Sequence, residues 1–114
     1  MNTNRTLESE MHIGNIMSIL QSSNLINKYT FIAKIKALPF VQKIILFGSR
    51  ARGTQQLRSD IDIAIVCPHV TPQQWQKILD IVEQADTLLK IDCLQFDKAD
   101  NDLKQRILKD GIEL

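Results

Sequence analysis

Two aspartates separated by one residue stand at the start of an apolar run, and they are the strongest chemical signal in this chain. Asp60 and Asp62 alternate with isoleucines in the string Asp60-Ile61-Asp62-Ile63. Because side chains of a strand alternate between its two faces, both aspartates share one face, about 6.5 Å apart. At an effective dielectric near 20, their charges repel by about 2–3 kcal/mol. A divalent cation that prefers hard oxygen ligands, such as Mg²⁺, removes this repulsion and explains the pair.

A third acid, Asp92, lies in the middle of another apolar run, Ile91-Asp92-Cys93-Leu94. An isolated buried charge is very costly, so an acid at this position needs a reason. If this run pairs beside the strand of Asp60 and Asp62, three carboxylates converge and can hold one or two Mg²⁺ ions. Two such ions stabilise an in-line displacement at phosphorus. The alternative is that Asp92 lies at a strand edge and faces solvent.

A phosphate-binding corner is predicted just before the aspartates, in Gly48-Ser49-Arg50-Ala51-Arg52. Gly48 ends an apolar run, and a glycine lets a phosphate approach the backbone closely. The N–H groups that follow it and the Ser49 hydroxyl can donate hydrogen bonds to an anion. Arg50 and Arg52 add positive charge. The corner therefore predicts a site for a triphosphate whose α-phosphorus faces the aspartates.

A P-loop is the rival phosphate motif, because Gly48 and Gly53 have its glycine spacing. A P-loop requires a lysine followed by serine or threonine after the second glycine. Thr54 occupies the lysine position here, and no Lys-Ser or Lys-Thr follows Gly53. This motif is therefore excluded.

The elements that must position these residues follow an α/β pattern. Helices are expected over about Thr6–Gln21, Leu25–Ala37, Thr71–Ala85 and Asp97–Lys109, with a single helical turn over Ser49–Gly53. Strands are expected over Lys43–Phe47, Asp60–Val66 and Leu88–Phe96. The polar residues 22–24 break the first two helices apart. Thr71 is the expected N-cap of its helix, and Gly111 is the expected C-terminal glycine of the last.

This order predicts a small mixed sheet of three to four strands flanked by helices in one domain, residues 1–114. An extra N-terminal helix occupies about residues 1–24, and a catalytic core occupies about 25–114. Inward positions of the third helix are Trp75, Ile78, Leu79 and Val82.

Composition narrows the class of protein. With 44% hydrophobic and 24% charged residues, the chain is expected to fold as a globular domain. The net charge of +1 lacks the basic excess of duplex-binding proteins, so direct nucleic-acid binding is not expected. The N-terminus is polar, and no apolar run is long enough to span a bilayer. Cys67 and Cys93 are interpreted as reduced, buried cysteines, which fits the cytoplasm.

The motif resembles the signature of the polymerase-beta-type nucleotidyltransferase superfamily. That signature is a hydrophobic residue, Gly-Ser, a spacer, Asp-hydrophobic-Asp and a later aspartate on a neighbouring strand. The string Phe-Gly-Ser-Arg-Ala-Arg-Gly followed by Ser-Asp-Ile-Asp-Ile is similar to the minimal nucleotidyltransferases, or MNT proteins. The resemblance covers about residue 41 to the C-terminus, and the nucleotidyltransferase fold is expected from it.

The resemblance implies roles for each residue of the motif. Asp60 and Asp62 bind both metal ions, while Asp92 binds the catalytic ion and helps to activate the attacking hydroxyl. Gly48 and Ser49 position the triphosphate. MNT proteins are typically the antitoxins of HEPN/MNT toxin–antitoxin modules, whose HEPN partner is a ribonuclease toxin. The resemblance therefore implies transfer of AMP from ATP to a tyrosine of a HEPN partner.

Two other functions stay open. An antitoxin can block its partner by occlusion without chemistry, although a pure blocker has no need of three clustered acids. A small-molecule nucleotidyltransferase of the aminoglycoside-modifying type is disfavoured, because only about eighteen residues follow the third strand and they cannot enclose a small acceptor. Side chains interpreted as surface or helix-face groups without a site role are His12, His69, Lys104, Arg106 and Lys109.

Overall fold

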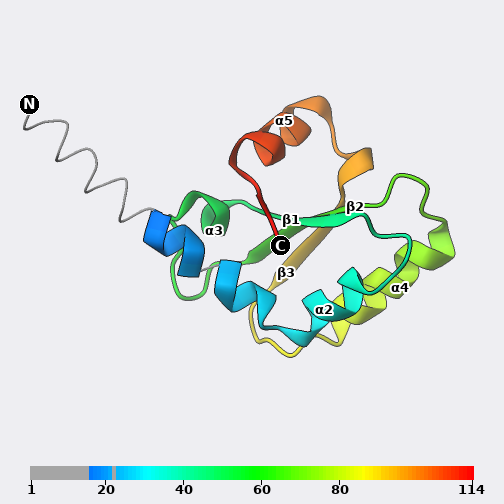
Figure 1. The fold of residues 1–114 in the computed structure, drawn as a ribbon, viewed down its shortest axis with the longest axis horizontal. Coiled ribbons are helices and arrows are strands. Elements are labelled where there is room, and N and C mark those ends of the chain that lie inside the picture. Colours follow the sequence, from blue (N-terminus) through cyan, green and yellow to red (C-terminus); the bar gives the residue numbers. More distant parts are fainter. Residues whose placement is uncertain (1–15, 22) are drawn as a thin grey trace, which may run out of the picture.

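The computed structural model describes residues 16–21 and 23–114 of the chain. The elements in order are α2 (Thr30–Lys36), β1 (Lys43–Phe47), α3 (Ser49–Arg52), β2 (Ile61–Val66), α4 (Pro72–Glu83), β3 (Ile91–Gln95), the 3-10 turn η1 (Phe96–Lys98), α5 (Asn101–Asp110) and β4 (Ile112–Glu113). Residues 16–21 and 23–27 are also helical. Figure 1 shows the sheet in the middle of the molecule, with α5 on one side and α2 and α4 on the other.

The four strands form one sheet in the order β3-β2-β1-β4. β1 pairs antiparallel with both β2 and β4, whereas β2 pairs parallel with β3. The predicted mixed sheet flanked by helices is therefore confirmed. The parallel pair is the important one for the site, because its register places Asp62 opposite Asp92.

Strand boundaries follow the predictions to within a few residues. β1 has the predicted bounds, and β2 begins at Ile61, one residue after Asp60. β3 is shorter than predicted: it begins at Ile91, because the fully exposed Leu88 belongs to the loop before it. Phe96, the predicted last residue of this strand, begins η1 instead.

One face of the sheet is covered by α2 and α4. Alternate residues of β1 and β2 point to this face and are fully buried against the two helices. They are Ile44, Leu46, Ile61, Ile63 and Ile65. Period-two alternation in both strands explains this dry layer, since every second residue faces the same helices.

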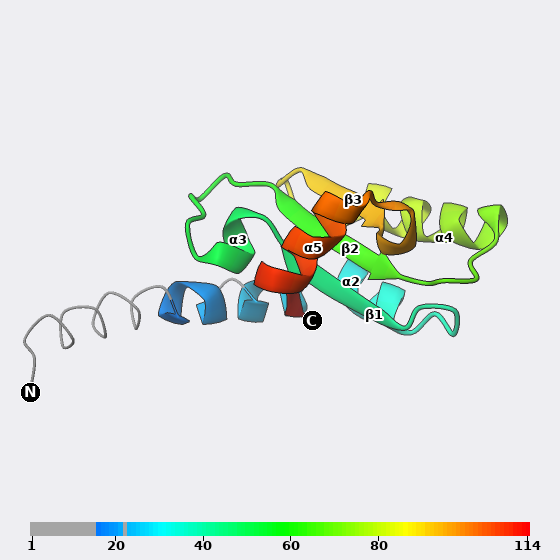
Figure 2. The ribbon, with the colours of Figure 1, turned by 90° about the horizontal axis from the view of Figure 1, so that it is seen from above.

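The opposite face is covered by α5, which lies across the strands in Figure 2. Its core is smaller: Ile45, Ala64 and Val66 of the sheet pack against Ile107 of α5. Half-buried neighbours on this face are Phe47, Leu94, Phe96 and Leu103. Asp62 projects to the same face as Ala64, because two positions separate them.

The N-terminal helices are divided at a different place from the predicted one. Residues 6–15 and Ser22 lie outside the described residues. Ser23 and Asn24 are helical, and the Ser23 hydroxyl donates to the Leu20 carbonyl at 3.3 Å. The predicted break at residues 22–24 is therefore wrong for these two. The interruption comes at Lys28 and Tyr29 instead, so the helix predicted over residues 25–37 is split.

Helices α4 and α5 begin with the predicted kind of cap. Thr71 accepts from the Gln74 N–H and Gln74 returns a bond to the Thr71 N–H, a complete capping box. Of the predicted inward residues of α4, Ile78 is fully buried, while Trp75, Leu79 and Val82 are half-buried. The last predicted helix is divided into η1 and α5, with Asp100 as the N-cap of α5.

The C-terminal strand β4 was not predicted. It contains two residues, and the Leu114 N–H extends the pairing by donating to the Ile44 carbonyl at 2.9 Å. Gly111 ends α5 as predicted, but with φ −68° and not in the left-handed conformation. A Cβ at this position would collide with the Ile107 carbonyl and the Ile45 side chain. Gly111 is therefore required for close packing and not for its backbone freedom.

Candidate functional site

The carboxylates meet at one end of the sheet. Asp62, the second residue of β2, is the register partner of Asp92, the second residue of β3. Neighbouring strands lie about 4.8 Å apart, so the two side chains emerge close together on one face. Asp60 directly precedes β2. The structure therefore brings together the side chains of Asp62 and Asp92, with Asp60 near enough to act on Asp62 through its charge.

Electrostatic crowding is concentrated on Asp62. Burial is the largest cause that raises its pKa, followed by the hydrogen bond and charge of Asp92 and then by the charge of Asp60; Arg52 acts in the opposite direction. Together they raise the pKa of Asp62 from 3.8 to about 6. A carboxylate in this setting is short of positive charge, which is what a bound cation would supply.

Gly48 forms the wall beside Asp62. It follows β1, whose last residue Phe47 is the register partner of Asp62. Its backbone has φ 71° and ψ −153°, a region that residues with a Cβ rarely occupy. A Cβ at Gly48 would also collide with the Asp62 carboxylate. Both the conformation and the space therefore require glycine at this corner.

Ser49 begins α3 directly after this glycine. The Thr54 N–H donates to the Ser49 carbonyl at 3.0 Å, which closes the turn after α3. The Ser49 side chain is half-buried at the corner, between Gly48 and Arg50 in the chain. Its predicted contact with a phosphate stays a prediction.

The two arginines of α3 have different surroundings. Arg50 is only 4% exposed, and its Nε and Nη2 donate to the Ser59 carbonyl at 3.3 and 3.0 Å. Arg50 therefore fixes the loop that delivers Asp60, while its predicted contact with a nucleotide stays a prediction. Arg52 is exposed and lies near enough to Asp62 to lower its pKa.

A cavity of about 210 Å³ adjoins this corner. It is lined by Phe47, Gly48, Arg52, Leu103, Arg106 and Asp110. Arg106 was interpreted from the sequence as part of a solvated helix face, but the structure places it on this cavity. The only signal in the sequence was its three-residue spacing from Leu103, which puts both on one side of α5.

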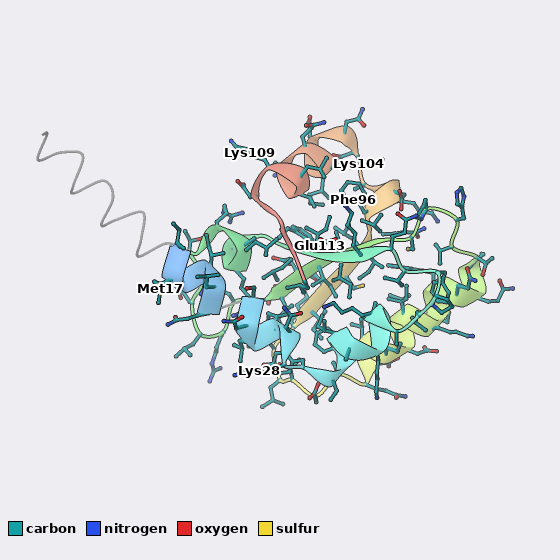
Figure 3. The ribbon with its side chains drawn as sticks, in the orientation of Figure 1. Met17, Lys28, Phe96, Lys104, Lys109 and Glu113 are labelled. Atoms are coloured by element: carbon teal, nitrogen blue, oxygen red, sulfur yellow. The ribbon has the colours of Figure 1, made fainter. Side chains whose placement is uncertain are left out.

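Two lysines, Lys90 and Lys104, contact Asp92 and Phe96 respectively. Lys90 Nζ lies 3.5 Å from Asp92 Oδ1, in a pair exposed to solvent. Lys104 Nζ lies 5.9 Å from the centroid of the Phe96 ring, and Figure 3 shows both residues on the α5 side of the sheet. Lys104 therefore packs on an aromatic ring and does not enter the cavity beside Gly48.

The metal set predicted from the sequence is not preassembled. Among residues 16–21 and 23–114, no three His, Cys, Asp or Glu side chains stand ready to coordinate a single ion. The donor chemistry nevertheless fits Mg²⁺, since Asp60, Asp62 and Asp92 offer only oxygen ligands and the charge of Arg52 does not offset the crowding at Asp62. The metal role of these three residues stays a prediction.

A second cavity, of about 640 Å³, contains none of the three aspartates. It lies between the residues around Tyr29 and two loops, residues 55–57 and 86–89.

The two cysteines, Cys67 and Cys93, are free, and burial raises the pKa of their thiols to about 11 and about 12. Both are therefore poor nucleophiles. Cys67 is buried as predicted, whereas Cys93 is half-buried. No helix of the described chain has the length and apolar character to cross a membrane.

Comparison with known proteins decides the family. The model of the family described as polymerase beta, nucleotidyltransferase matches residues 28–114. The chain belongs to this family. The superfamily predicted from the Gly-Ser and Asp-x-Asp motif is confirmed, and the match includes all seven predicted site residues, from Gly48 to Asp92.

The chain is similar to a protein adenylyltransferase. The protein adenylyltransferase MntA of Shewanella oneidensis is 30% identical over 79 residues, which are 68% of this chain and 55% of that protein. The chain thus spans about half the length of the curated relative it matches. This likeness confirms the predicted resemblance to MNT proteins.

Solved structures agree with this likeness. A toxin–antitoxin crystal structure with AMP-PNP is 28% identical, with a TM-score of 0.53 over 74% of this chain and 69% of that one. A mutant MntA-HpeT toxin–antitoxin complex is 29% identical, with a TM-score of 0.56 over 81% of this chain and 70% of that one. A nucleotidyltransferase structure from Sulfolobus solfataricus, 22% identical with a TM-score of 0.53 over 88% of this chain and 85% of that one, supports the fold alone.

Proposed function

We propose that this chain transfers AMP from ATP to a tyrosine of a HEPN ribonuclease toxin, with Mg²⁺ bound by Asp60, Asp62 and Asp92. The observation that carries the proposal is the register of the parallel pair, which sets Asp62 opposite Asp92 beside Gly48. The MntA relative is named a protein adenylyltransferase, and a similar solved toxin–antitoxin structure contains AMP-PNP. Both similarities support transfer of AMP from ATP as the chemistry of this chain.

The chemistry needs one bond made and one broken. The acceptor oxygen forms a bond to the α-phosphorus of ATP, and its proton passes to the carboxylate of Asp92. The bond from the α-phosphorus to the bridging oxygen breaks, and pyrophosphate leaves. Mg²⁺ bound at the aspartates would neutralise charge that develops on the phosphate oxygens. Gly48 lets the Asp62 carboxylate lie directly against the backbone of this corner, because a Cβ there would collide with it.

A partner protein is supported by an apolar surface at the same end of the molecule. Leu25, Leu57 and Leu88 are exposed and together line the cavity of about 640 Å³. Met17, which is also exposed and is labelled in Figure 3, extends this apolar group along the N-terminal helix. Gln55 Nε2 joins that helix to the loop before β2 by donating to the Ser18 hydroxyl at 3.0 Å. Exposed apolar patches of this kind are typical of protein-binding surfaces.

Since ATP and ribonuclease substrates are both abundant in the cytoplasm, the proposed reaction takes place there. The absence of a basic excess, with a net charge of +1, supports a protein acceptor and not a duplex.

The test combines this chain with its HEPN partner, ATP and Mg²⁺ and measures the mass of the partner. We expect a mass increase of one AMP on a tyrosine. The Asp62→Asn variant should transfer AMP at least about a hundredfold more slowly, because it removes a charged ligand from the reacting centre. The matched control is Asp80→Asn, an exposed acid on α4, which covers the opposite face of the sheet, and it should leave the rate unchanged.

Occlusion without chemistry is the second candidate, and one observation favours it. Lys90 Nζ lies 3.5 Å from Asp92 Oδ1, so one of the three proposed metal ligands already has a cationic partner. Under this alternative, Asp62→Asn would still neutralise the toxin in cells, and the mass of the partner would not change with the wild-type chain.

A further inference from the structure

We infer that Arg106 of α5 contacts the pyrophosphate portion of the nucleoside triphosphate proposed to bind at Gly48, as a second cation beside Arg52. The inference rests on the proposed function and names the part of the substrate that the cavity beside Gly48 takes. It adds a residue from the C-terminal helix to a site otherwise built from β1, α3, β2 and β3.

The position of the cavity follows from the order of strands. Across the end of the sheet, Asp92 on β3 neighbours Asp62 on β2, and Asp62 is the partner of Phe47 at the end of β1. Phe47 and Gly48 then form part of the cavity wall. The carboxylates and the cavity are therefore adjoining parts of one surface, with the Gly48 corner between them.

The charge of the cavity suits a phosphate chain. Arg52 reaches it from α3 and Arg106 from α5, so two guanidinium groups from separate elements line one small space. Among the described residues, neither arginine lies within 4.0 Å of an acidic side chain. The ion pair observed there joins Lys90 and Asp92. Guanidinium groups bind phosphate oxygens through two parallel N–H donors, and they are the preferred partners of such anions.

Arg106 does not contribute to the packing of α5 on the sheet. The helix packs on the sheet through the buried Ile107 and the half-buried Leu103, whereas Arg106 is exposed. Asp110 lines the same cavity one turn further along the helix. Its negative charge lies near the helix C-terminus, where an acid opposes the helix dipole, and it reduces the attraction of the cavity for phosphate.

The position of the cavity fixes the direction from which the acceptor hydroxyl approaches the α-phosphorus. An in-line displacement requires the attacking oxygen and the leaving group on opposite sides of the phosphorus. If pyrophosphate leaves toward Arg52 and Arg106, the acceptor hydroxyl must approach from the side of Asp92. The predicted role of Asp92 as the group that receives the acceptor proton agrees with that direction.

The test compares binding of ATP and of AMP to the full chain with Mg²⁺ by calorimetry. We expect Arg106→Ala to weaken ATP binding by about tenfold or more, since one charge-assisted contact is lost, while AMP binding stays unchanged. Arg106→Lys should retain part of the ATP affinity. Lys109→Ala removes the same charge from the same helix outside the cavity, and it should change neither affinity.

The outcomes separate this inference from the proposed function. If the wild-type chain binds ATP and Arg106→Ala binds it equally well, or loses ATP and AMP affinity alike, the assignment of Arg106 is wrong and the transferase proposal is untouched. If ATP affinity depends on Arg106 but no AMP reaches the HEPN partner, the cavity assignment holds and the proposed function fails. A wild-type chain that binds neither nucleotide overturns both.

Discussion

The two faces of the sheet differ in how completely they are covered. On the face packed by α2 and α4, alternate residues of β1 and β2 are fully buried aliphatic side chains along the whole length of the strands. On the face packed by α5, the aliphatic layer is shorter, and the end beyond Ala64 carries Asp62 and Asp92. One face is therefore used for stability along its whole length, while the other leaves one end free for charged groups.

This difference shows how a small domain can carry repelling acids. Asp62 raises the free energy of the folded state, because burial and neighbouring acids disfavour its charge. The cost is tolerated because the opposite face supplies a continuous core, with residues such as Ile63 and Ile65 fully buried. The strands shared by both faces transmit this rigidity to the site.

The largest expected effect comes from Gly48, which lies directly after β1 and beside Asp62. Gly48→Ala places a Cβ against the Asp62 carboxylate and strains a backbone at φ 71°. We expect AMP transfer to fall by about a hundredfold or more, since small displacements of reacting groups have effects of this size. Transfer assays with the proposed HEPN partner measure it.

Gly53→Ala is the matched control for this prediction. Gly53 also has a positive φ, 75°, but it ends α3 away from the aspartates. Its replacement should destabilise the chain by about 1 kcal/mol and leave most of the transfer rate. Equal loss of activity in both variants would show that backbone strain, and not the space beside Asp62, controls the site.

The next effect separates the two faces by stability. Ile65→Ala on the face of α2 and α4 should lower the free energy of unfolding by about 3 kcal/mol, because Ile65 is fully buried. Leu94→Ala on the face of α5 should lower it by about 1–2 kcal/mol, since Leu94 is only half-buried. Urea denaturation measures both values. Equal losses would contradict the unequal covering of the two faces.

The smallest effect is the pH dependence that Asp62 imposes. Its pKa is about 6 in the folded chain and 3.8 in an unfolded one, so the folded state binds this proton more tightly. Its contribution to stability is therefore fully present below pH 3.8 and is lost as the pH rises through about 6. Because Asp62 is partly exposed, the change is on the order of 1 kcal/mol.

Melting temperatures of the wild type and Asp62→Asn, measured without Mg²⁺ between pH 4 and pH 8, test this pH dependence. The variant should gain stability relative to the wild type as the pH rises, with no further gain well above pH 6. Curves that remain parallel throughout would show that Asp62 is not strained by its neighbours. Added Mg²⁺ should stabilise the wild type at pH 7 and not the variant.

Much of the local structure could be predicted from the sequence. The apolar run from Lys43 to Phe47, the turn after Gly48 and the capping box of Thr71 each depend on neighbours within a few residues. The third strand was predicted too long, because the apolar Leu88 resembles a strand residue while it lies fully exposed in a loop. β4 was missed, since two residues carry no readable periodicity.

The site itself could be predicted only in part. Asp60 and Asp62 were placed on one face by alternation alone, but their assembly with Asp92 depended on an untested assumption about strand pairing. The burial of Arg50 against the Ser59 carbonyl had no local signal, and the location of Arg106 had only its three-residue spacing from Leu103. Each depends on a contact that forms only when the chain folds: the loop of Ser59 returns to α3, and α5 packs beside Gly48.

The sequence by itself determined the motif, the alternation predicted to set Asp60 and Asp62 on one side of a strand, and the family to which such a motif belongs. Only the tertiary structure decided that Asp92 faces Asp62 and that α5 brings Arg106 to the corner of Gly48. The physical reason is the range of the forces. Side-chain alternation follows from backbone dihedral angles residue by residue, whereas strand register and helix placement depend on how the whole apolar surface is buried.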